Sequence, residues 1–170
     1  MKKIALAVTV CSVMALSACK KEAPADIPPP PQNVVTPTPT PPLPPQGPIP
    51  GTQAHFAREM AGSDTIYFDT DMFNVDAEDQ AALRQQATYL QQFSNIRATI
   101  EGHADERGTR EYNIALGERR ANAAKNYLIS LGVAADRLGV VSYGKERPVA
   151  TGSDEQSWAR NRRAVTITID

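Results

Sequence analysis

Cysteine is scarce in this chain: Cys11 and Cys19 are the two cysteines among 170 residues. If the chain is cleaved before Cys19, a single cysteine remains and no intrachain disulfide can form, even in an oxidising compartment. A lone cysteine in an exported protein then needs a role of its own.

Histidine is equally scarce, with only His55 and His103 present. His103 stands in H-x-D spacing with Asp105, a spacing that is common by chance, so we expect it to be a structural or supporting residue and not a metal ligand. No H-E-x-x-H motif occurs, and Ser63 and Ser153 lack the histidine and aspartate context of a serine hydrolase. The sequence therefore predicts no catalytic residue, no metal and no cofactor.

An excess of one charge is also missing, because the net charge of the whole chain is −1. Loss of Lys2 and Lys3 with a cleaved leader would remove two positive charges and give about −3. This is not the charge balance of a nucleic-acid-binding protein. We expect Arg160, Arg162 and Arg163, near the C-terminus, to form a solvated or ion-paired edge.

Long apolar runs are rare as well. The run at 4–16 follows two lysines and is too short and wrongly flanked to span a membrane, as expected of a secretory signal. Its last residue, Leu16, begins the tetrapeptide LSAC at 16–19, which matches the bacterial lipoprotein box, where cleavage leaves the cysteine as the new N-terminus. We therefore expect a signal peptide at 1–18 and lipidation of Cys19.

Lipidation of Cys19 predicts how the chain is anchored. One acyl chain holds a protein at a membrane only marginally, and bacterial lipoproteins resemble one another in carrying three on this cysteine. Lys20 stands where lipoproteins retained in the inner membrane carry aspartate, so we expect the outer membrane. An ordinary secreted protein with a chance cysteine is the alternative interpretation.

Proline is concentrated in one segment, since 13 of the 14 prolines lie between residues 24 and 50. Proline lacks a backbone N–H and fixes φ, so this segment can build neither a helix nor a sheet ladder. We expect residues 19–55 to contain a tether whose proline-rich part reaches up to roughly 80 Å at ~3.1 Å per residue. A strut that carries a domain away from a membrane is one interpretation; a leader without a required length is the other.

Residues 56–170 have a different composition and suffice for one domain. Alternation and helical periodicity predict strands at 64–68, 96–102, 136–144 and 163–170, helices at 76–93 and 110–132, and a helical turn at 153–161. Asp76 is expected to cap the first helix and Gly132 to end the second.

The order of these elements predicts the fold class. Helices between strands imply crossover connections, and hence an α/β (α+β) two-layer sandwich with a small mixed sheet of about four strands and helices on one face. The last strand places Val165, Ile167 and Ile169 on one face and Thr166 and Thr168 on the other.

Arg120 breaks the apolar stripe of the helix at 110–132, where it follows Leu116 by one turn. A guanidinium stays charged and is costly to bury alone, so it needs an anionic partner. Asp105 lies in the preceding strand-to-helix turn, where α/β folds usually place ligands. Two interpretations remain open: a structural Asp105–Arg120 ion pair, or a cleft that both residues share with a ligand.

The chain resembles the peptidoglycan-associated lipoproteins of the OmpA C-terminal-like family in four segments: YFDTDMFNVD, IEGHADERGTREYNIALGERRANAAKNYL, VVSYGKERP and NRRAVTIT. The resemblance covers residues from about 60 to 170 and also the lipoprotein box. One departure is Gly117, which replaces the serine of the family's LSERRA motif and weakens a helix interior by roughly 1 kcal/mol against alanine.

The resemblance implies non-covalent binding of the peptidoglycan stem peptide at its meso-diaminopimelate residue. Asp105 would take the ammonium of that residue, and Arg120 would fork onto a carboxylate with two parallel hydrogen bonds. The further contacts that it implies are Phe68, Asp69, Arg107, Thr109, Asn113 and Leu116. Alternatively, Phe68 belongs to the core and Asn113 bonds the loop backbone.

The resemblance also implies partners: the periplasmic β-propeller protein TolB and the other Tol components, which support outer-membrane constriction at cell division. The domain would then face the periplasm. The rival hypothesis is an enzyme, a peptidoglycan amidase or peptidase, which would need a metal triad or an activated nucleophile that the sequence does not offer. We expect Trp158 to pack in the last helical turn and not to serve as a sugar platform.

Overall fold

A computed structural model describes residues 47–169 of the chain, which belong to one compact unit, Leu43–Asp170. The expected signal peptide, Cys19 and most of the tether lie outside the described residues and stay predictions. The elements follow in the order α1 (Gln53–Met60), β1 (Thr65–Tyr67), α2 (Ala77–Gln92), β2 (Arg97–His103), α3 (Arg110–Ser130), the 3-10 turn η1 (Ala135–Arg137), β3 (Leu138–Gly144), α4 (Glu155–Asn161) and β4 (Arg163–Ile169).

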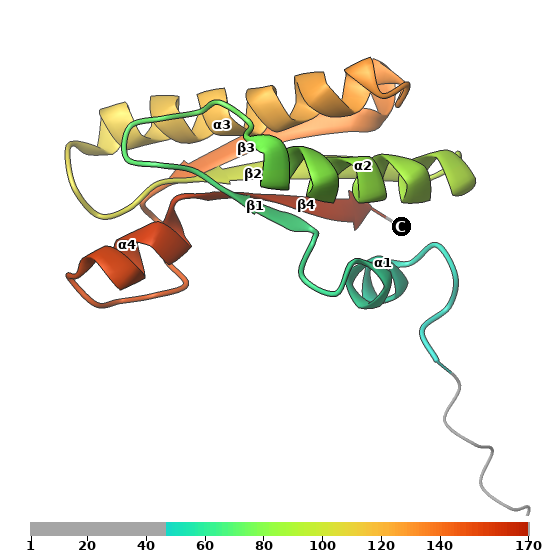
Figure 1. The fold of residues 1–170 in the computed structure, drawn as a ribbon, viewed down its shortest axis with the longest axis horizontal. Helices are drawn as coiled ribbons and strands as arrows, with labels where there is room; N and C mark the ends of the chain where they lie inside the picture. The colour runs from blue at the N-terminus through green and yellow to red at the C-terminus, as the bar shows by residue number, and fades with distance from the viewer. Residues whose placement is uncertain (1–46, 170) are drawn as a thin grey trace, which may run out of the picture. The chain divides into compact units, whose positions relative to one another are not determined.

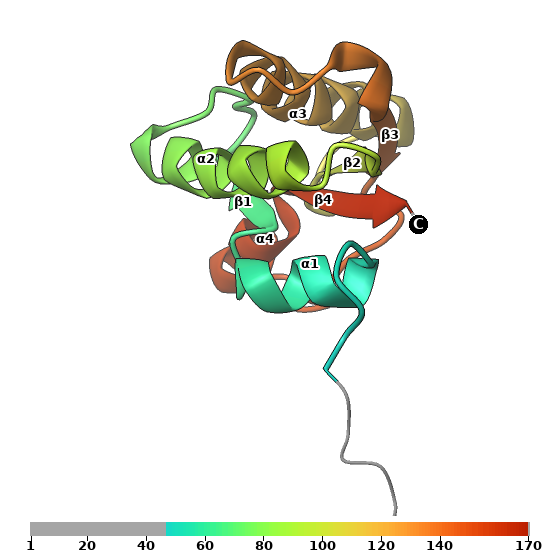
Figure 2. The same cartoon turned by 90° about the vertical axis from the view of Figure 1, so that its right-hand side faces the viewer.

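The four strands form one mixed sheet in the order β1-β4-β2-β3. β2 and β3 are parallel, and β4 is antiparallel to both β1 and β2. The long helices α2 and α3 cover one face of this sheet (Figures 1 and 2). The short helix α1 packs beside β4 and α2, and α4 directly precedes β4. The predicted α+β fold, with its two long helices on one face, is thus confirmed.

Capping side chains set the starts of the two long helices, as the sequence predicts for Asp76. The carboxylate of Asp76 accepts a hydrogen bond from the backbone N–H of Asp79 at the start of α2. The hydroxyl of Thr109 does the same for Tyr112 at the start of α3. After α3 the chain turns at Gly132, whose φ of 96° favours glycine.

The core lies between the sheet and the two long helices and includes Leu83, Leu90, Ile100 and Leu128. In β4 the buried residues are Arg163, Ala164, Thr166 and Thr168, whereas Val165 and Ile167 are half-buried and Ile169 is exposed. The alternation predicted for this strand is therefore present, but its threonine face points to the core. Thr166 is satisfied there because its hydroxyl donates to Gln86 at 2.7 Å.

Helix α1 was not expected, because its first residues fall within the predicted tether. Thr52 caps it by accepting from the N–H of His55, and Phe56 and Met60 are buried with Tyr89 and Ile96 in a second, small apolar cluster. His55, at 2.8 Å from the hydroxyl of Tyr89, is thus part of a helix and not of a linker. The folded part begins where the prolines end and a capping residue stands.

Two glycines bring α3 against β2. A Cβ at Gly102 would overlap the backbone carbonyl of Gly117, and a Cβ at Gly117 would overlap the hydroxyl of Ser142. The glycine that replaces the family's serine therefore has a structural reason here, namely a backbone-to-backbone contact that a side chain would push apart. Within the part of the chain that the structure describes, no helix has the length and apolarity needed to cross a bilayer.

Candidate functional site

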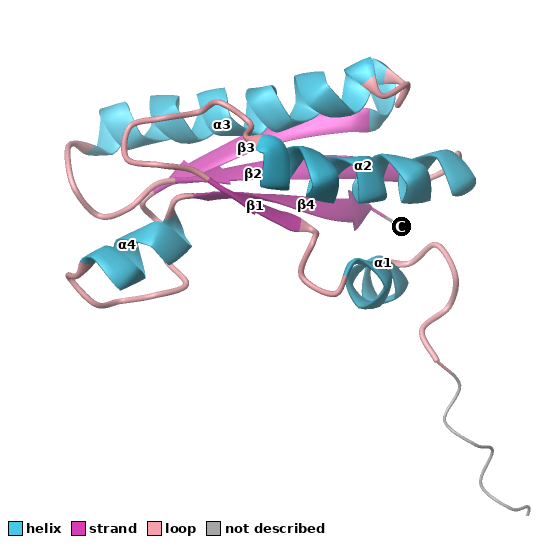
Figure 3. Cartoon of the chain, viewed as in Figure 1, coloured by secondary structure: helices cyan, strands magenta, loops and turns pink. Residues whose placement is uncertain are grey.

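A cleft of about 240 Å³ opens at the end of the sheet where β1 and β2 end and β4 begins. The loop after β1, the loop after β2 and helix α3 meet there (Figure 3). Five of the eight predicted ligand residues line it: Asp105, Arg107, Asn113, Leu116 and Arg120; Thr70, Asp71, Ala104, Gly108 and Tyr112 complete the lining.

The other three predicted residues lie close to this cleft. Phe68 and Asp69 line a neighbouring cleft of about 330 Å³ that also touches Arg160 and Arg162. Phe68 is 6% exposed and belongs to the core, as the alternative interpretation holds. Thr109 caps α3, and its hydroxyl is engaged in that role.

Arg120 lies in the floor of the cleft and is 0% exposed. Its guanidinium donates to three backbone carbonyls: Nε to Met72 at 2.9 Å, Nη1 to His103 at 2.9 Å and Nη2 to Asp69 at 3.0 Å. It therefore ties the loop after β1 to the end of β2. Among the described residues, Asp105 and Arg120 do not form an ion pair. The interpretation of a structural Asp105–Arg120 pair is therefore wrong, because Asp105 pairs with Arg107 and Arg162 instead.

Burial and charge both act on Arg120. Desolvation, together with the nearby charge of Arg162, lowers the pKa of its guanidinium to about 10, although Asp105 and Asp71 act in the opposite direction. The cation is thus retained at neutral pH. Of its five N–H donors, the carbonyls take one on each nitrogen, so one N–H on each terminal nitrogen is left for another acceptor.

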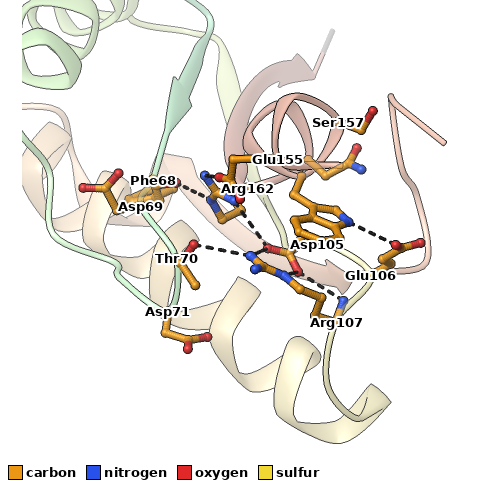
Figure 4. A network of polar contacts seen from close by, with 12 residues as sticks. Phe68, Asp69, Thr70, Asp71, Asp105, Glu106, Arg107, Glu155, Ser157 and Arg162 are labelled. Carbon is orange, nitrogen blue, oxygen red and sulfur yellow. Dashed lines mark hydrogen bonds and ion pairs between the residues drawn. The ribbon is translucent and has the colours of Figure 1, made fainter. Parts of the chain in front are cut away.

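Asp105 lies between two arginines at the mouth of the cleft (Figure 4). Its Oδ1 accepts from the backbone N–H of Arg107 at 3.1 Å and from its Nε at 3.0 Å, and its Oδ2 accepts from Nη2 of Arg107 at 2.7 Å. Nη1 of Arg162 lies 3.6 Å from the same Oδ2. Burial alone would raise the pKa of Asp105, but the hydrogen bonds and charges of Arg107 and Arg162 outweigh it and lower the pKa.

Of the two alternatives predicted for the arginine edge, solvated or ion-paired, Arg162 takes the second, since it is ion-paired with Glu155 and Asp105. Arg162 and Arg163 are both buried, and only Arg160 is exposed. Nε of Arg162 donates to the carbonyl of Phe68 at 2.9 Å, and its Nη2 donates to Glu155 at 2.7 Å. The antiparallel pairing of β1 with β4 explains its place, because the start of β4 then lies beside the end of β1.

Arg107 is the exposed arginine of the site, with 39% of its side chain accessible. Its guanidinium carbon lies 4.2 Å from the ring centroid of Trp158, and Nη2 also donates to the hydroxyl of Thr70 at 3.3 Å. The indole N–H of Trp158 donates to Glu106 at 3.0 Å. Trp158, expected only to pack in the last helical turn, therefore joins α4 to the loop after β2.

Asn113 and Leu116 are buried on the side of α3 that faces the cleft. The amide of Asn113 donates to the carbonyl of Arg107 at 2.7 Å, so it holds the loop after β2 in place, as the alternative interpretation has it. Leu116, 4% exposed, supplies an apolar surface beside Arg120.

His103 ends β2 with its ring buried and both ring nitrogens without a hydrogen-bond partner. Burial lowers the pKa of His103 to about 4, and the charges of Arg163 and Arg147 act in the same direction. The carboxylate oxygen Oε2 of Glu101 lies 3.7 Å from Nε2 of His103. In the part of the chain that the structure describes, no group of three or more His, Cys, Asp and Glu side chains is placed to hold a metal ion.

The sequence analysis missed Arg162, Thr70, Asp71 and Tyr112 as members of the site. Thr70 and Asp71 lie in the loop that follows β1. Because strand ends meet at one edge of a sheet, their position after a predicted strand could have indicated that they belong to the site. Tyr112 lies one residue before Asn113 in the first turn of α3, and its hydroxyl donates to Asp71 at 3.3 Å. For Arg162 the signal was its position immediately before β4.

Comparisons with known proteins agree with this geometry. The sequence pattern of the OmpA family matches residues 67–162. The peptidoglycan-associated lipoprotein of Rhizobium meliloti (strain 1021) is 52% identical over 118 residues, which is 69% of this chain and 66% of that protein. The match thus spans slightly less than two thirds of that relative's length. The peptidoglycan-associated lipoprotein of Pseudomonas aeruginosa is 58% identical over 99 residues, 58% of each chain.

Solved structures show the same fold. The crystal structure of the peptidoglycan-associated lipoprotein from Burkholderia pseudomallei superposes with a TM-score of 0.60 at 48% identity, over 62% of this chain and 89% of that one. The cell wall anchor of the T6SS from Pseudomonas aeruginosa matches with a TM-score of 0.57 at 24% identity, over 72% of this chain and 100% of that one, which is a likeness of fold alone. With its pattern matched over more than half of its length, the chain belongs to the OmpA family.

Proposed function

We propose that this chain is an outer-membrane lipoprotein that binds peptidoglycan non-covalently and thereby links the membrane to the cell wall. The observation that carries the proposal is the cleft at the sheet end, where the carboxylate of Asp105 lies among three arginine side chains, Arg107, Arg120 and Arg162. Acid and base side by side suit a ligand that carries both charges. The names of the relatives at about half identity support the same ligand.

The ligand centre that we propose is the meso-diaminopimelate of the stem peptide, which offers a free ammonium and carboxylates. Asp105 would accept the ammonium, which replaces the hydrogen bonds that it now receives from Arg107. Arg120 would attract a carboxylate with the N–H donors that its backbone contacts leave over. Phe68, Asp69, Thr109, Asn113 and Leu116 would act by shaping the cleft and by holding its loops.

Binding without catalysis is part of the proposal. The hydrogen bonds of Asp105, Arg107, Asn113 and Arg120 join carboxylate and guanidinium groups to one another, to backbone groups or to the hydroxyl of Thr70, which suits the binding of a charged ligand. The rival hypothesis of a peptidoglycan amidase or peptidase predicts the release of soluble fragments from cell-wall sacculi. We expect the purified chain to sediment with sacculi and to release none.

The decisive variant is Asp105→Asn, which keeps the shape of the side chain and removes its charge. We expect it to lose sedimentation with sacculi while its melting curve stays cooperative. Asp136→Asn, an exposed acid in η1 outside the cleft, is the matched control and should sediment like the wild type. If the Asp105 variant sediments normally, the cleft is not the site.

The cellular setting is proposed on the resemblance. Anchoring through Cys19 with the domain in the periplasm, TolB and the other Tol components as partners, and a role in outer-membrane constriction during division all accord with a tethered wall-binding domain. If TolB contacts the same cleft, stem peptide and TolB compete. A competition assay in which saturating stem peptide leaves TolB binding unchanged would refute a shared surface.

A further inference from the structure

Helix α1 stands in the sequence between the expected tether and the sheet. It packs against α2 and the last residues of β4, at the end of the sheet opposite to the cleft (Figure 1). If tension acts between an anchor at Cys19 and a wall bound at the cleft, it reaches α1 before any strand, because α1 is the first element of the described chain. The contacts that hold α1 therefore decide how such a link responds to load.

The apolar contacts of α1 form a cluster of their own. Phe56 and Met60 are buried against Tyr89 and Ile96, and none of these four residues belongs to the main core between the sheet and the long helices. His55 adds a polar contact, with its ring nitrogen Nδ1 2.8 Å from the hydroxyl of Tyr89. Helix α1 can therefore leave the domain without removing a side chain from the main core.

The side chain of Gln53 joins α1 to the sheet. Its oxygen accepts from the backbone N–H of Thr168 at 2.7 Å and from the hydroxyl of the same residue at 2.9 Å. Strand β1 does not extend to this part of β4, since it pairs with Arg163–Val165. The edge of β4 beyond β1 is thus covered by side-chain contacts of α1 and not by strand pairing, and such contacts can be lost one at a time.

The attachment of the chain to the domain changes at Ser63. The carbonyl of Ser63 accepts from the buried amide of Gln86 at 2.6 Å, and the carbonyl of Asp64 accepts from the backbone N–H of Thr166 at 2.9 Å. From β1 onward the chain also takes part in the main core through Ile66. Tension that removes α1 therefore meets a more firmly held segment at Ser63.

A sharp turn separates α1 from this segment. Ala61 and Gly62 both have positive φ, of 48° and 99°, and a Cβ added at Gly62 would meet no atom. Helix α1 has eight residues, fewer than a helix needs to be stable alone in water. Once undocked it should unfold, so that residues 53–64 become extensible chain of at most roughly 40 Å.

We propose that α1 is a releasable link: under tension applied at Cys19 it leaves the domain before the sheet opens, and it lengthens the tether while the cleft keeps its shape. This inference rests on the proposed function, which supplies the anchor and the wall. It predicts more than fraying of a chain end, because release stops at Ser63 and yields a fixed length of chain.

The test pulls on single molecules of the chain from Cys19 onward, without acyl chains. Cys19 is the only cysteine after the expected leader, so Arg110→Cys, at an exposed position in the first turn of α3 near the cleft, supplies the second attachment. We expect two steps. The first releases at most roughly 40 Å of chain, and the second, at higher force, is longer and opens the sheet.

Substitutions in α1 should separate the two steps. Phe56→Ala removes the ring at the centre of the α1 cluster and should release α1 at least about tenfold faster, with the second step unchanged. Arg58→Ala, on the exposed side of the same helix, is the matched control and should leave both steps as in the wild type. Met60→Ala replaces Phe56→Ala if melting curves show that the latter does not fold.

Each outcome bears on the inference. A first step that Phe56→Ala accelerates alone supports it. A single step in which α1 and the sheet open together overturns it, and so does an equal acceleration of both steps in Phe56→Ala.

Binding to cell-wall sacculi tests whether the cleft survives release. Phe56 does not line the cleft, so Phe56→Ala should sediment with sacculi like the wild type. A loss of sedimentation in this variant would overturn the claim that the cleft keeps its shape without α1. If the wild type does not sediment either, the proposed function fails, whereas the pulling measurement, which needs no cell wall, still decides the order of release.

Discussion

The floor of the cleft and its mouth hold their arginines in opposite ways. Arg120, in the floor, is fully buried and donates to three carbonyls of the main chain. Arg107, at the mouth, is partly exposed and donates mainly to one carboxylate. Backbone carbonyls are fixed in place, whereas a partly exposed ion pair can open. We therefore expect Arg120 to contribute mainly to stability, and in our proposal the residues at the mouth contact the ligand.

Substitution in the floor should have the largest effect on stability. Arg120→Ala leaves three carbonyls without their donor, and we expect a loss of about 3–5 kcal/mol in the free energy of unfolding. Urea unfolding measures this loss. Arg119→Ala, which removes an exposed neighbour on the same helix, is the control and should change the free energy of unfolding by no more than about 0.5 kcal/mol. A loss of binding in Arg120→Ala without a loss of stability would reverse our view of the floor.

The next largest effect on stability is expected at the backbone contact between Gly102 in β2 and Gly117 in α3, which sets the position of α3 and so of Arg120. Gly102→Ala places a methyl group against the carbonyl of Gly117, and backbone atoms cannot rotate aside as a flexible side chain can. We expect a destabilisation of about 1–3 kcal/mol, the cost of overpacking. The matched change Gly62→Ala meets no atom but requires φ of 99°, so it reports backbone strain alone. A Gly102 variant as stable as the wild type would show that α3 is free to shift.

Acid should weaken the same region through His103, whose carbonyl accepts from Arg120. The folded state lowers the pKa of this ring to about 4 from an ordinary value of 6.5. Between these values the unfolded chain binds the proton and the folded chain does not, so the stability present above pH 6.5 is lost as pH falls to about 4. We expect a contribution of about 2–3 kcal/mol.

Urea unfolding at pH 7.5 and pH 4.5 measures that contribution. His103→Gln should lose less stability between the two values than the wild type does. Equal losses in both proteins would assign the acid sensitivity to other groups.

Substitution at the mouth should have the smallest effect on stability. Arg107→Ala removes a contact whose guanidinium is partly solvated, and we expect a change below about 1 kcal/mol. The same measurement on Arg162→Ala, whose side chain is buried and joins Phe68 to Glu155, should give a clearly larger loss. Arg160→Ala serves as the exposed control from α4. If Arg107→Ala destabilises the protein as strongly as Arg162→Ala, the partly exposed contact of Arg107 contributes as much to the fold as the buried contacts of Arg162.

Local patterns in the sequence were enough for most of the fold. Asp76 and Thr109 cap helices as their residue types favour, and Gly132 follows α3 in a conformation that glycine adopts readily. The alternation in β4 did not say which face is buried. The threonine face is buried because Gln86 on α2 and Gln53 in α1 accept hydrogen bonds from the hydroxyls of Thr166 and Thr168. Those partners are distant in sequence and carry no local signal.

Five of the eight residues predicted for the site line the cleft, but the hydrogen-bond partners of these residues were not predictable. The misfit of Arg120 and the loop position of Asp105 located the cleft, but hydrogen-bond partners depend on which strand lies beside which. Arg162 reaches Asp105 only because β4 starts next to the end of β1. A run such as NRRAV gives no local indication that its arginines are buried, so the sequence could not choose between a solvated and an ion-paired edge.

A titration of the full chain with a diaminopimelate muropeptide, followed by NMR, tests the central claim most directly. We expect the largest shifts at the guanidinium Nε–H of Arg107, at the amide of Asn113 and along the loop after β2, and little change on the outer face of β4 at Val165 and Ile167. No shift at saturating ligand, or shifts confined to the outer face of the sheet, would contradict the claim that this cleft binds the cell wall.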